Sequence, residues 1–221
     1  MMRAARDLKP RLLVTIGDFA DFYAVSSHSK DPKRALTLES EITAVNAKLD
    51  ELDALGARDK IFIEGNHCDR LLRYLRDRAP ELFDVVSTPA LFRLAQRGWQ
   101  HIPYRQYTKR GALYLTHDVG SSGRNSVFRS LETFKHSVVT GHSHRFAYIV
   151  EGDATGEHRV SAQFGWLGDA KQVDYLNRVR AMKDWALGFG VGYYDRATGY
   201  VYLTPIPIVK YTCVVNGKLY R

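Results

Sequence analysis

At 221 residues, with 45% apolar and 25% charged side chains, the chain has the length and composition of one globular domain, which excludes a disordered or fibrous protein. Its formal net charge of +8 favours polyanionic partners through electrostatic steering. No stretch is apolar over the ~20 residues of a membrane span, no secretory signal begins the chain, and Cys68 and Cys213 provide no disulfide framework, so we expect a cytoplasmic protein.

The first half of the chain alternates short apolar runs with helical patterns. The run 12–16 predicts a strand, and residues 37–55, with apolar side chains at steps of three and four, predict an amphipathic helix that stops at Gly56. A second strand over 60–63 and a helix over 69–77 follow. Because a strand, a helix and a strand in this order form a right-handed crossover, this part of the sheet should be parallel.

The second half reads as mostly strands. Predicted strands cover 111–116, 137–140, 146–151 and 158–164, with a hairpin turn at 152–156, and a further hairpin joins 189–195 to 199–204. The aromatic residues of the tail are expected to pack between sheets rather than to form a base-stacking platform; they are Trp166, Trp185, Phe189, Tyr193, Tyr194, Tyr200 and Tyr202. Residues 168–185 show no pattern that predicts a role.

Groups able to bind metal follow four of the apolar runs. They stand in Gly17-Asp18-Phe19-Ala20-Asp21, Gly65-Asn66-His67, His117 and Gly141-His142-Ser143-His144. Taken one at a time, these strings also fit turn residues, a helix cap or a surface pair of histidines. All four together, each at a strand end, favour a metal centre built from loops at one sheet edge. The chemistry this indicates is metal-assisted hydrolysis of a phosphate ester.

In these strings the chain resembles the calcineurin-like metallophosphoesterases, whose pattern is Asp-x-His, Gly-Asp-x-x-Asp, Gly-Asn-His-Asp/Glu, a lone His and Gly-His-x-His. The resemblance runs over about residues 12–208 and is greatest to small bacterial and phage-type members. Other segments similar to theirs are 31–34, 65–75, 193–195 and 205–208. The resemblance implies an α/β fold with residues 1–221 in a single domain, a four-layer α-β-β-α sandwich of two mixed sheets flanked by helices.

The resemblance also implies up to two divalent metal ions, most often Mn²⁺ and otherwise Fe or Zn²⁺. Asp18 would bridge the two ions. Asn66, His117 and His142 would complete the ligand shell of one ion, and His144 would bind the other. A metal-activated hydroxide would then attack a phosphomonoester or phosphodiester, including one derived from nucleic acid.

Two further residues receive catalytic roles from the same resemblance. His67 would transfer a proton or stabilise the phosphoryl transition state without binding metal, and Asp21 would orient its imidazole. A carboxylate bonded to one ring nitrogen fixes the tautomer of a histidine and raises its basicity. We therefore predict His67 and Asp21 as the catalytic pair.

One element of the family pattern is missing. The sixteen residues before Gly17 contain no histidine, so neither the first strand nor its Asp-x-His is present. The ion held by Asp18 and His144 should therefore bind weakly, and the exposed sheet edge should favour dimerisation or poor solubility. Two hypotheses stay open: an active phosphoesterase, and a catalytically impaired relative that acts as a metal-binding or scaffold protein.

The predicted helix 69–77 concentrates positive charge beside the Gly-Asn-His loop. Its arginines are Arg70, Arg73, Arg76 and Arg78. Nucleic-acid binding and a solvated helix face paired with Asp69 and Asp77 are both consistent with this pattern. No recognised nucleic-acid module is present, so sequence-specific binding is not expected.

Overall fold

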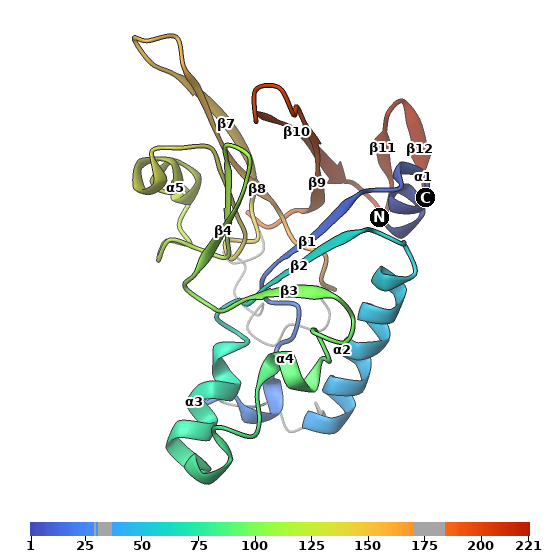
Figure 1. Cartoon of the computed structure of the whole chain (residues 1–221), viewed down its shortest axis with the longest axis vertical. Helices are drawn as coiled ribbons and strands as arrows, with labels where there is room; N and C mark the ends of the chain where they lie inside the picture. The colour runs from blue at the N-terminus through green and yellow to red at the C-terminus, as the bar shows by residue number, and fades with distance from the viewer. Residues whose placement is uncertain (29, 31–36, 170–183) are drawn as a thin grey trace. The chain divides into compact units, whose positions relative to one another are not determined.

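The computed structural model of the chain describes residues 1–28, 30, 37–169 and 184–221 (Figure 1). The family-like segment 31–34, and residues 170–183 of the stretch without a predicted role, lie outside the described residues. The chain is mixed α/β, as predicted, and divides into two compact units: residues 5–106, and residues 1–4 together with 107–221. A single domain over 1–221 stays a prediction.

A parallel three-stranded sheet in the order β1-β2-β3 organises residues 5–106 (Figure 1). Its strands are β1 (Leu12–Ile16), β2 (Asp59–Ile63) and β3 (Trp99–Ile102). The predicted parallel pairing is confirmed, since β1 and β2 run in register from Leu12 opposite Asp59 to Ile16 opposite Ile63. Strand β3 was not predicted, because polar Gln100 and His101 interrupt its apolar pattern.

Helix α2 (Leu38–Asp53) begins at a capping box. The Thr37 side chain accepts the Ser40 N–H, and the Ser40 hydroxyl accepts the Thr37 N–H. Leu49, on the apolar face of the helix, is fully buried in the core. The helix predicted over 37–55 is therefore confirmed, with its end two residues earlier.

The rest of this unit packs around one hydrophobic core. Its remaining helical segments are the 3-10 turns η1 (Tyr23–Val25) and η2 (Pro80–Leu82) and the helices α3 (Asp69–Arg78) and α4 (Thr88–Leu91). Leu71 and Leu75 anchor α3 in the core, which confirms the helix predicted over 69–77. The rings of Phe22 and Phe92 stack with centroids 5.7 Å apart at the core centre.

The second unit contains a mixed five-stranded sheet in the order β4-β5-β6-β8-β7. Its strands are β4 (Tyr107–Arg110), β5 (Leu113–Thr116), β6 (Val138–Thr140), β7 (Phe146–Gly152) and β8 (His158–Phe164), and the helices of the unit are α5 (Ser126–Phe134) and the first residues of α1 (Met2–Leu8). Strands β5, β6 and β8 run parallel, while β4 and β7 pair antiparallel with their neighbours. The strand predicted over 111–116 begins at Leu113, because Gly111, at φ 56°, belongs to the turn after β4.

Two antiparallel hairpins complete this unit. They are β9 (Leu187–Tyr194) with β10 (Val201–Ile208), and β11 (Cys213–Val215) with β12 (Lys218–Tyr220). The first confirms the predicted C-terminal hairpin. None of the described helices combines the length and apolar character needed to cross a membrane.

The predicted packing of the tail aromatics is wrong for three tyrosines. Tyr193, Tyr194 and Tyr202 are 48%, 55% and 58% exposed. The face of β9 that carries its glycines packs closely against Phe164 instead. A Cβ at Gly190 would lie 2.2 Å from the Phe164 ring. Because side chains alternate along a strand, Tyr193 points to the opposite face, where it lies across from Tyr202.

A partly buried charge network joins α2 to β2 and β3. Asp53 Oδ1 accepts from Lys60 Nζ at 2.6 Å and from Trp99 Nε1 at 2.8 Å, and Asp53 Oδ2 accepts from Arg97 Nη1 at 2.7 Å. Burial alone would raise the pKa of Asp53, but the hydrogen bonds from Lys60, Arg97 and Trp99 outweigh it and lower the pKa. The ionised carboxylate therefore stabilises the fold.

Replacing Asp53 should destabilise the protein strongly. Asp53→Ala leaves Lys60, whose side chain is only 13% exposed, without its carboxylate, and leaves Arg97, also 13% exposed, with Asp50 alone. We expect the free energy of unfolding, measured with urea, to fall by about 3–5 kcal/mol. Because the pKa of Asp53 is lowered, its contribution is complete above pH 3.8 and disappears as the pH falls through the lowered value.

Glu51→Ala is the matched control on the same helix. Glu51 pairs with Lys48 in an exposed ion pair, so its loss should cost less than about 1 kcal/mol. Equal losses for the two variants would contradict the structural role of the Asp53 network.

Candidate functional site

The loops after β1 and β2 lie side by side because the two parallel strands end in register at Ile16 and Ile63. Asp18 Oδ1 accepts the main-chain N–H of His67 at 3.0 Å. Gly65 permits this approach, since a Cβ there would lie 2.0 Å from Asp18 Oδ1 and 2.4 Å from the Asp18 nitrogen. The Gly-Asp and Gly-Asn-His strings therefore form one structure, with Asn66 partly buried between Gly65 and His67.

Beside Asp18, the imidazole of His67 lies between a carboxylate and a guanidinium. His67 Nδ1 lies 2.7 Å from Asp21 Oδ1, and His67 Nε2 lies 3.2 Å from Arg70 Nη2. A guanidinium can only donate, so Nε2 accepts and Nδ1–H donates to Asp21. Both ring nitrogens are thus engaged, which fits a role for His67 other than metal binding.

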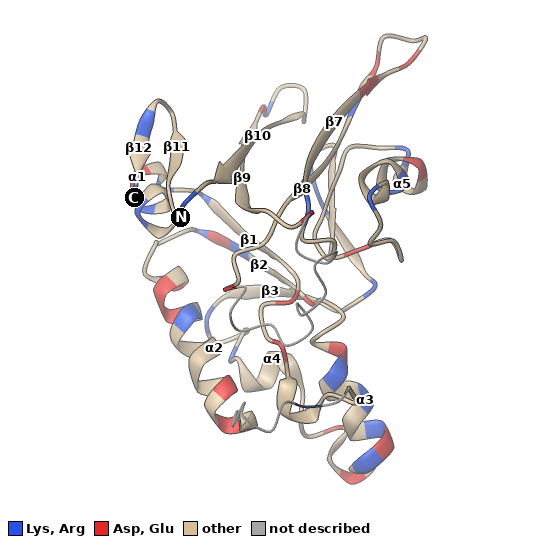
Figure 2. Ribbon diagram, turned by 180° about the vertical axis from the view of Figure 1, so that it is seen from behind, with Lys and Arg blue, Asp and Glu red and all other residues tan. Residues whose placement is uncertain are grey.

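Arg70 was missed as a site residue, because its place on a charged helix indicated either a solvated face or nucleic-acid binding. Its side chain is only 11% exposed, and it donates to the Asp21 carbonyl at 2.9 Å and also to the Asp21 carboxylate. The signal was its spacing, because the turn that opens α3 brings the residue three positions after His67 back to the side of His67. Arg73 does lie in the predicted solvated setting, paired with Asp69 at 3.2 Å, and Figure 2 shows both signs of charge along α3.

A carboxylate from α2 fixes the loop that carries Asp21. Glu41 accepts the main-chain N–H groups of Phe22 and Tyr23, the latter at 3.1 Å. Burial raises the pKa of Glu41, and the two N–H groups act in the opposite direction. Phe22 has a left-handed conformation, with φ 49°, and its buried ring anchors the loop in the core.

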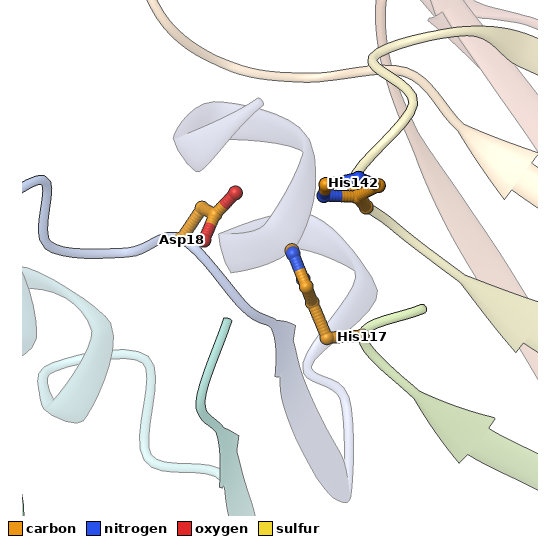
Figure 3. A group of neighbouring side chains, drawn as sticks. All are labelled: Asp18, His117 and His142. Atoms are coloured by element: carbon orange, nitrogen blue, oxygen red, sulfur yellow. The ribbon is translucent and has the colours of Figure 1, made fainter. Parts of the chain in front are cut away.

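In the second unit, two predicted ligands come together at the ends of neighbouring strands. His117 follows β5 and His142 follows β6, and these strands are parallel neighbours. Gly141 N–H donates to the His117 carbonyl at 2.8 Å, so the two loops are joined. The two rings meet edge to face, with centroids 5.3 Å apart (Figure 3), and His117 is 1% exposed.

His144 lies in a different setting from His142. Its ring stacks on Trp166, with centroids 5.3 Å apart, and meets Trp185 edge to face at 4.1 Å. His142 and His144 have φ values of 62° and 55°, a left-handed conformation that costs about 1–2 kcal/mol for each residue with a Cβ. The two histidines of the Gly-His-x-His string therefore face different neighbours within a strained loop.

Along most of its length the chain is similar in sequence to a phage protein. No protein-family model matches the chain. The chain is 25% identical to the Gene 54 protein of Mycobacterium phage D29 over 238 residues, covering 97% of this chain and 88% of that protein. The name of that protein states no activity.

Adding one methyl group at Gly65 should disrupt the site. Gly65→Ala places a Cβ against the main chain of Asp18, so the β1 loop must move. We expect the free energy of unfolding to fall by about 1–3 kcal/mol, as for other overpacked substitutions. Binding of Mn²⁺, measured by calorimetry, should weaken as Asp18 is displaced.

Gly123→Ala is the control, because a Cβ there meets nothing within 4 Å and the residue does not have a left-handed φ. Mn²⁺ affinity equal in the two variants would contradict the dependence of the site on close approach at Gly65.

Proposed function

We propose that this protein is a metal-dependent hydrolase of phosphate esters, and that Asp18, His117 and His142 hold a divalent metal ion. One observation carries the proposal: each of the three residues offers one ligand atom, and these atoms lie within 4.8 Å of one another (Figure 3). One carboxylate oxygen and two imidazole nitrogens suit Mn²⁺, Fe or Zn²⁺. Asn66, held beside Asp18 by the Gly65 loop, is proposed as a further ligand.

The nature of the donors supports this choice of metals. Burial raises the pKa of the Cys68 thiol next to the Gly-Asn-His string, so it is not available as a soft thiolate ligand. When bound, a divalent ion at these residues would lower the pKa of a coordinated water and offset negative charge on the phosphoryl oxygens. The His144 ring is packed against two tryptophans. The proposal therefore requires only one metal ion, and a second ion bound by His144 is an addition to it.

The chain's own residues would act on the phosphoryl group from the side of His67. Asp21 and Arg70 fix the orientation of the imidazole, with Nε2 3.9 Å from Asp18 Oδ2. His67 would move a proton at Nε2 to or from the reacting oxygen, which would take the place of Arg70 as the partner of this nitrogen. Arg70, a partly buried guanidinium, would add positive charge where phosphoryl charge develops.

We further propose membership of the calcineurin-like metallophosphoesterases, with a four-layer sandwich as the complete fold. The order of the ligand-bearing strings along the chain and the parallel pairing of β1 with β2 support this assignment. The buried free thiols of Cys68 and Cys213 fit a cytoplasmic location. A phosphate-ester substrate is the proposed partner, and nucleic acid is one source of such esters.

Metal binding and hydrolysis can be tested together on the full chain. We expect Mn²⁺ to bind, by calorimetry, and Mn²⁺-dependent hydrolysis of bis- or mono-p-nitrophenyl phosphate. Asp18→Asn should weaken Mn²⁺ binding, because it replaces a charged ligand. His67→Ala should keep the metal and lower kcat by about 10²–10⁴-fold, the usual contribution of general acid–base catalysis.

His158→Ala serves as the control, since His158 is exposed on β8 and has no assigned role. A protein that binds Mn²⁺ but hydrolyses neither ester would favour the impaired, metal-binding alternative. Equal hydrolysis by the native protein and His67→Ala would remove His67 from the mechanism.

The role of Arg70 can be separated from that of its helix. Arg70→Ala removes the donor to His67 and the positive charge, so kcat should fall by about 10²-fold or more, as when one charge-stabilising donor is lost. Added guanidinium chloride at low concentration should restore part of the rate. Arg70→Lys should be intermediate, because lysine keeps the charge but not the planar fork.

Arg73→Ala is the matched control three residues further along α3, where the guanidinium is 49% exposed and pairs with Asp69. Equal rates for the two alanine variants would show that Arg70 contributes only general positive charge.

A further inference from the structure

A chain of buried polar side chains lies beneath the loop that carries His142 and His144. Its members come from β6, β8, α5 and the loop itself; they are Ser126, Ser130, Thr140, Ser143 and Gln163. Each is at most 4% exposed. Because buried polar groups are costly unless they are hydrogen-bonded, such a network is retained only where its bonds are made.

Gln163, on β8, is the centre of this network. Its Oε1 accepts from the Ser143 hydroxyl at 2.8 Å and from the Ser126 hydroxyl at 3.0 Å, and its Nε2 donates to Thr140 Oγ1 at 3.0 Å. One side chain thus joins the loop, the start of α5 and the end of β6. Thr140 and Gln163 are also register partners in the β6–β8 pair.

The loop needs such an anchor. His142 and His144, on either side of Ser143, both have positive φ, which is unfavourable for residues with a Cβ. Ser143 is the one residue between them, and it makes three bonds: its hydroxyl donates to Gln163 and accepts Arg145 N–H at 3.2 Å, and its N–H donates to the Gly141 carbonyl at 2.6 Å. A conformation of this kind persists only where the surroundings fix it.

We infer that Gln163 is a positioning residue, which acts through Ser143 to hold His142 in the orientation that ligates the metal. The inference rests on the proposed function, because it assigns a purpose to the metal ligand His142. Gln163 lies on β8 opposite Thr140, the last residue of β6 before the loop, and it reaches the loop through the Ser143 hydroxyl. Residues that hydrogen-bond to the segment carrying a metal ligand commonly fix the orientation of that ligand.

A network that only stabilises the fold and a network that positions His142 predict different effects of mutation. If Gln163 only stabilised the fold, losing its bond to Ser126 and losing its bond to Ser143 would have the same kind of effect. If Gln163 positions the loop, only the Ser143 side should change metal binding. Ser126 and Ser143 donate to the same oxygen and are equally buried, so they form a matched pair.

The experiment compares Gln163→Met, Ser143→Ala and Ser126→Ala with the native chain. Mn²⁺ affinity is measured by calorimetry, the visible spectrum of bound Co²⁺ reports ligand geometry, and thermal unfolding reports stability. Gln163→Met and Ser143→Ala should weaken Mn²⁺ binding by about 10–100-fold and change the Co²⁺ spectrum, as for other residues that orient metal ligands. Ser126→Ala should lower the unfolding temperature and leave both metal readouts unchanged.

Each outcome decides the inference. Metal binding by Ser143→Ala or Gln163→Met equal to that of the native chain would overturn it, and so would equal weakening in Ser126→Ala. If Gln163→Met does not fold, the comparison of Ser143→Ala with Ser126→Ala decides alone. A native chain that binds no Mn²⁺ would overturn the proposed function and this inference together. If the native chain binds Mn²⁺ and the variants bind it equally well, only the inference is overturned.

Discussion

The parallel pairing of β1 with β2 is the constraint on which the site depends. It brings the ends of both strands to the same edge, where Asp18 accepts the N–H of His67 and a side chain at Gly65 would have no room. The candidate ligand and the candidate catalytic histidine are therefore fixed to each other through the main chain.

The residues of the site that have a strained backbone are also the ones that neighbouring contacts hold in place. Asp18, His142 and His144 all have positive φ, although none is glycine. Left-handed non-glycine residues are concentrated at functional sites, where surrounding contacts hold them. Here those contacts are identified: the Gly65 loop against Asp18, and the Gln163 network beneath His142 and His144.

Local patterns predicted much of this structure, because they are set by neighbours in sequence. The period of 37–55 predicted α2, and the run 12–16 predicted β1. Features decided by tertiary contacts were missed. The bond of Arg70 to Asp21 depends on a loop forty-nine positions away in sequence, and the exposure of Tyr193 depends on which face of β9 packs. The spacing of Arg70 from His67 was the one sequence signal for its place, and it did not identify Asp21 as the partner.

The central claim is that Asp18, His117 and His142 bind one metal ion, and crystals grown with Mn²⁺ test it most directly. Anomalous scattering should show a peak bonded to one oxygen of Asp18 and one nitrogen of each histidine, at about 2.0–2.2 Å as for oxygen and nitrogen ligands of such ions. A peak held by other residues would contradict the account. So would a structure in which Asp18 and the two histidines lie on separate surfaces.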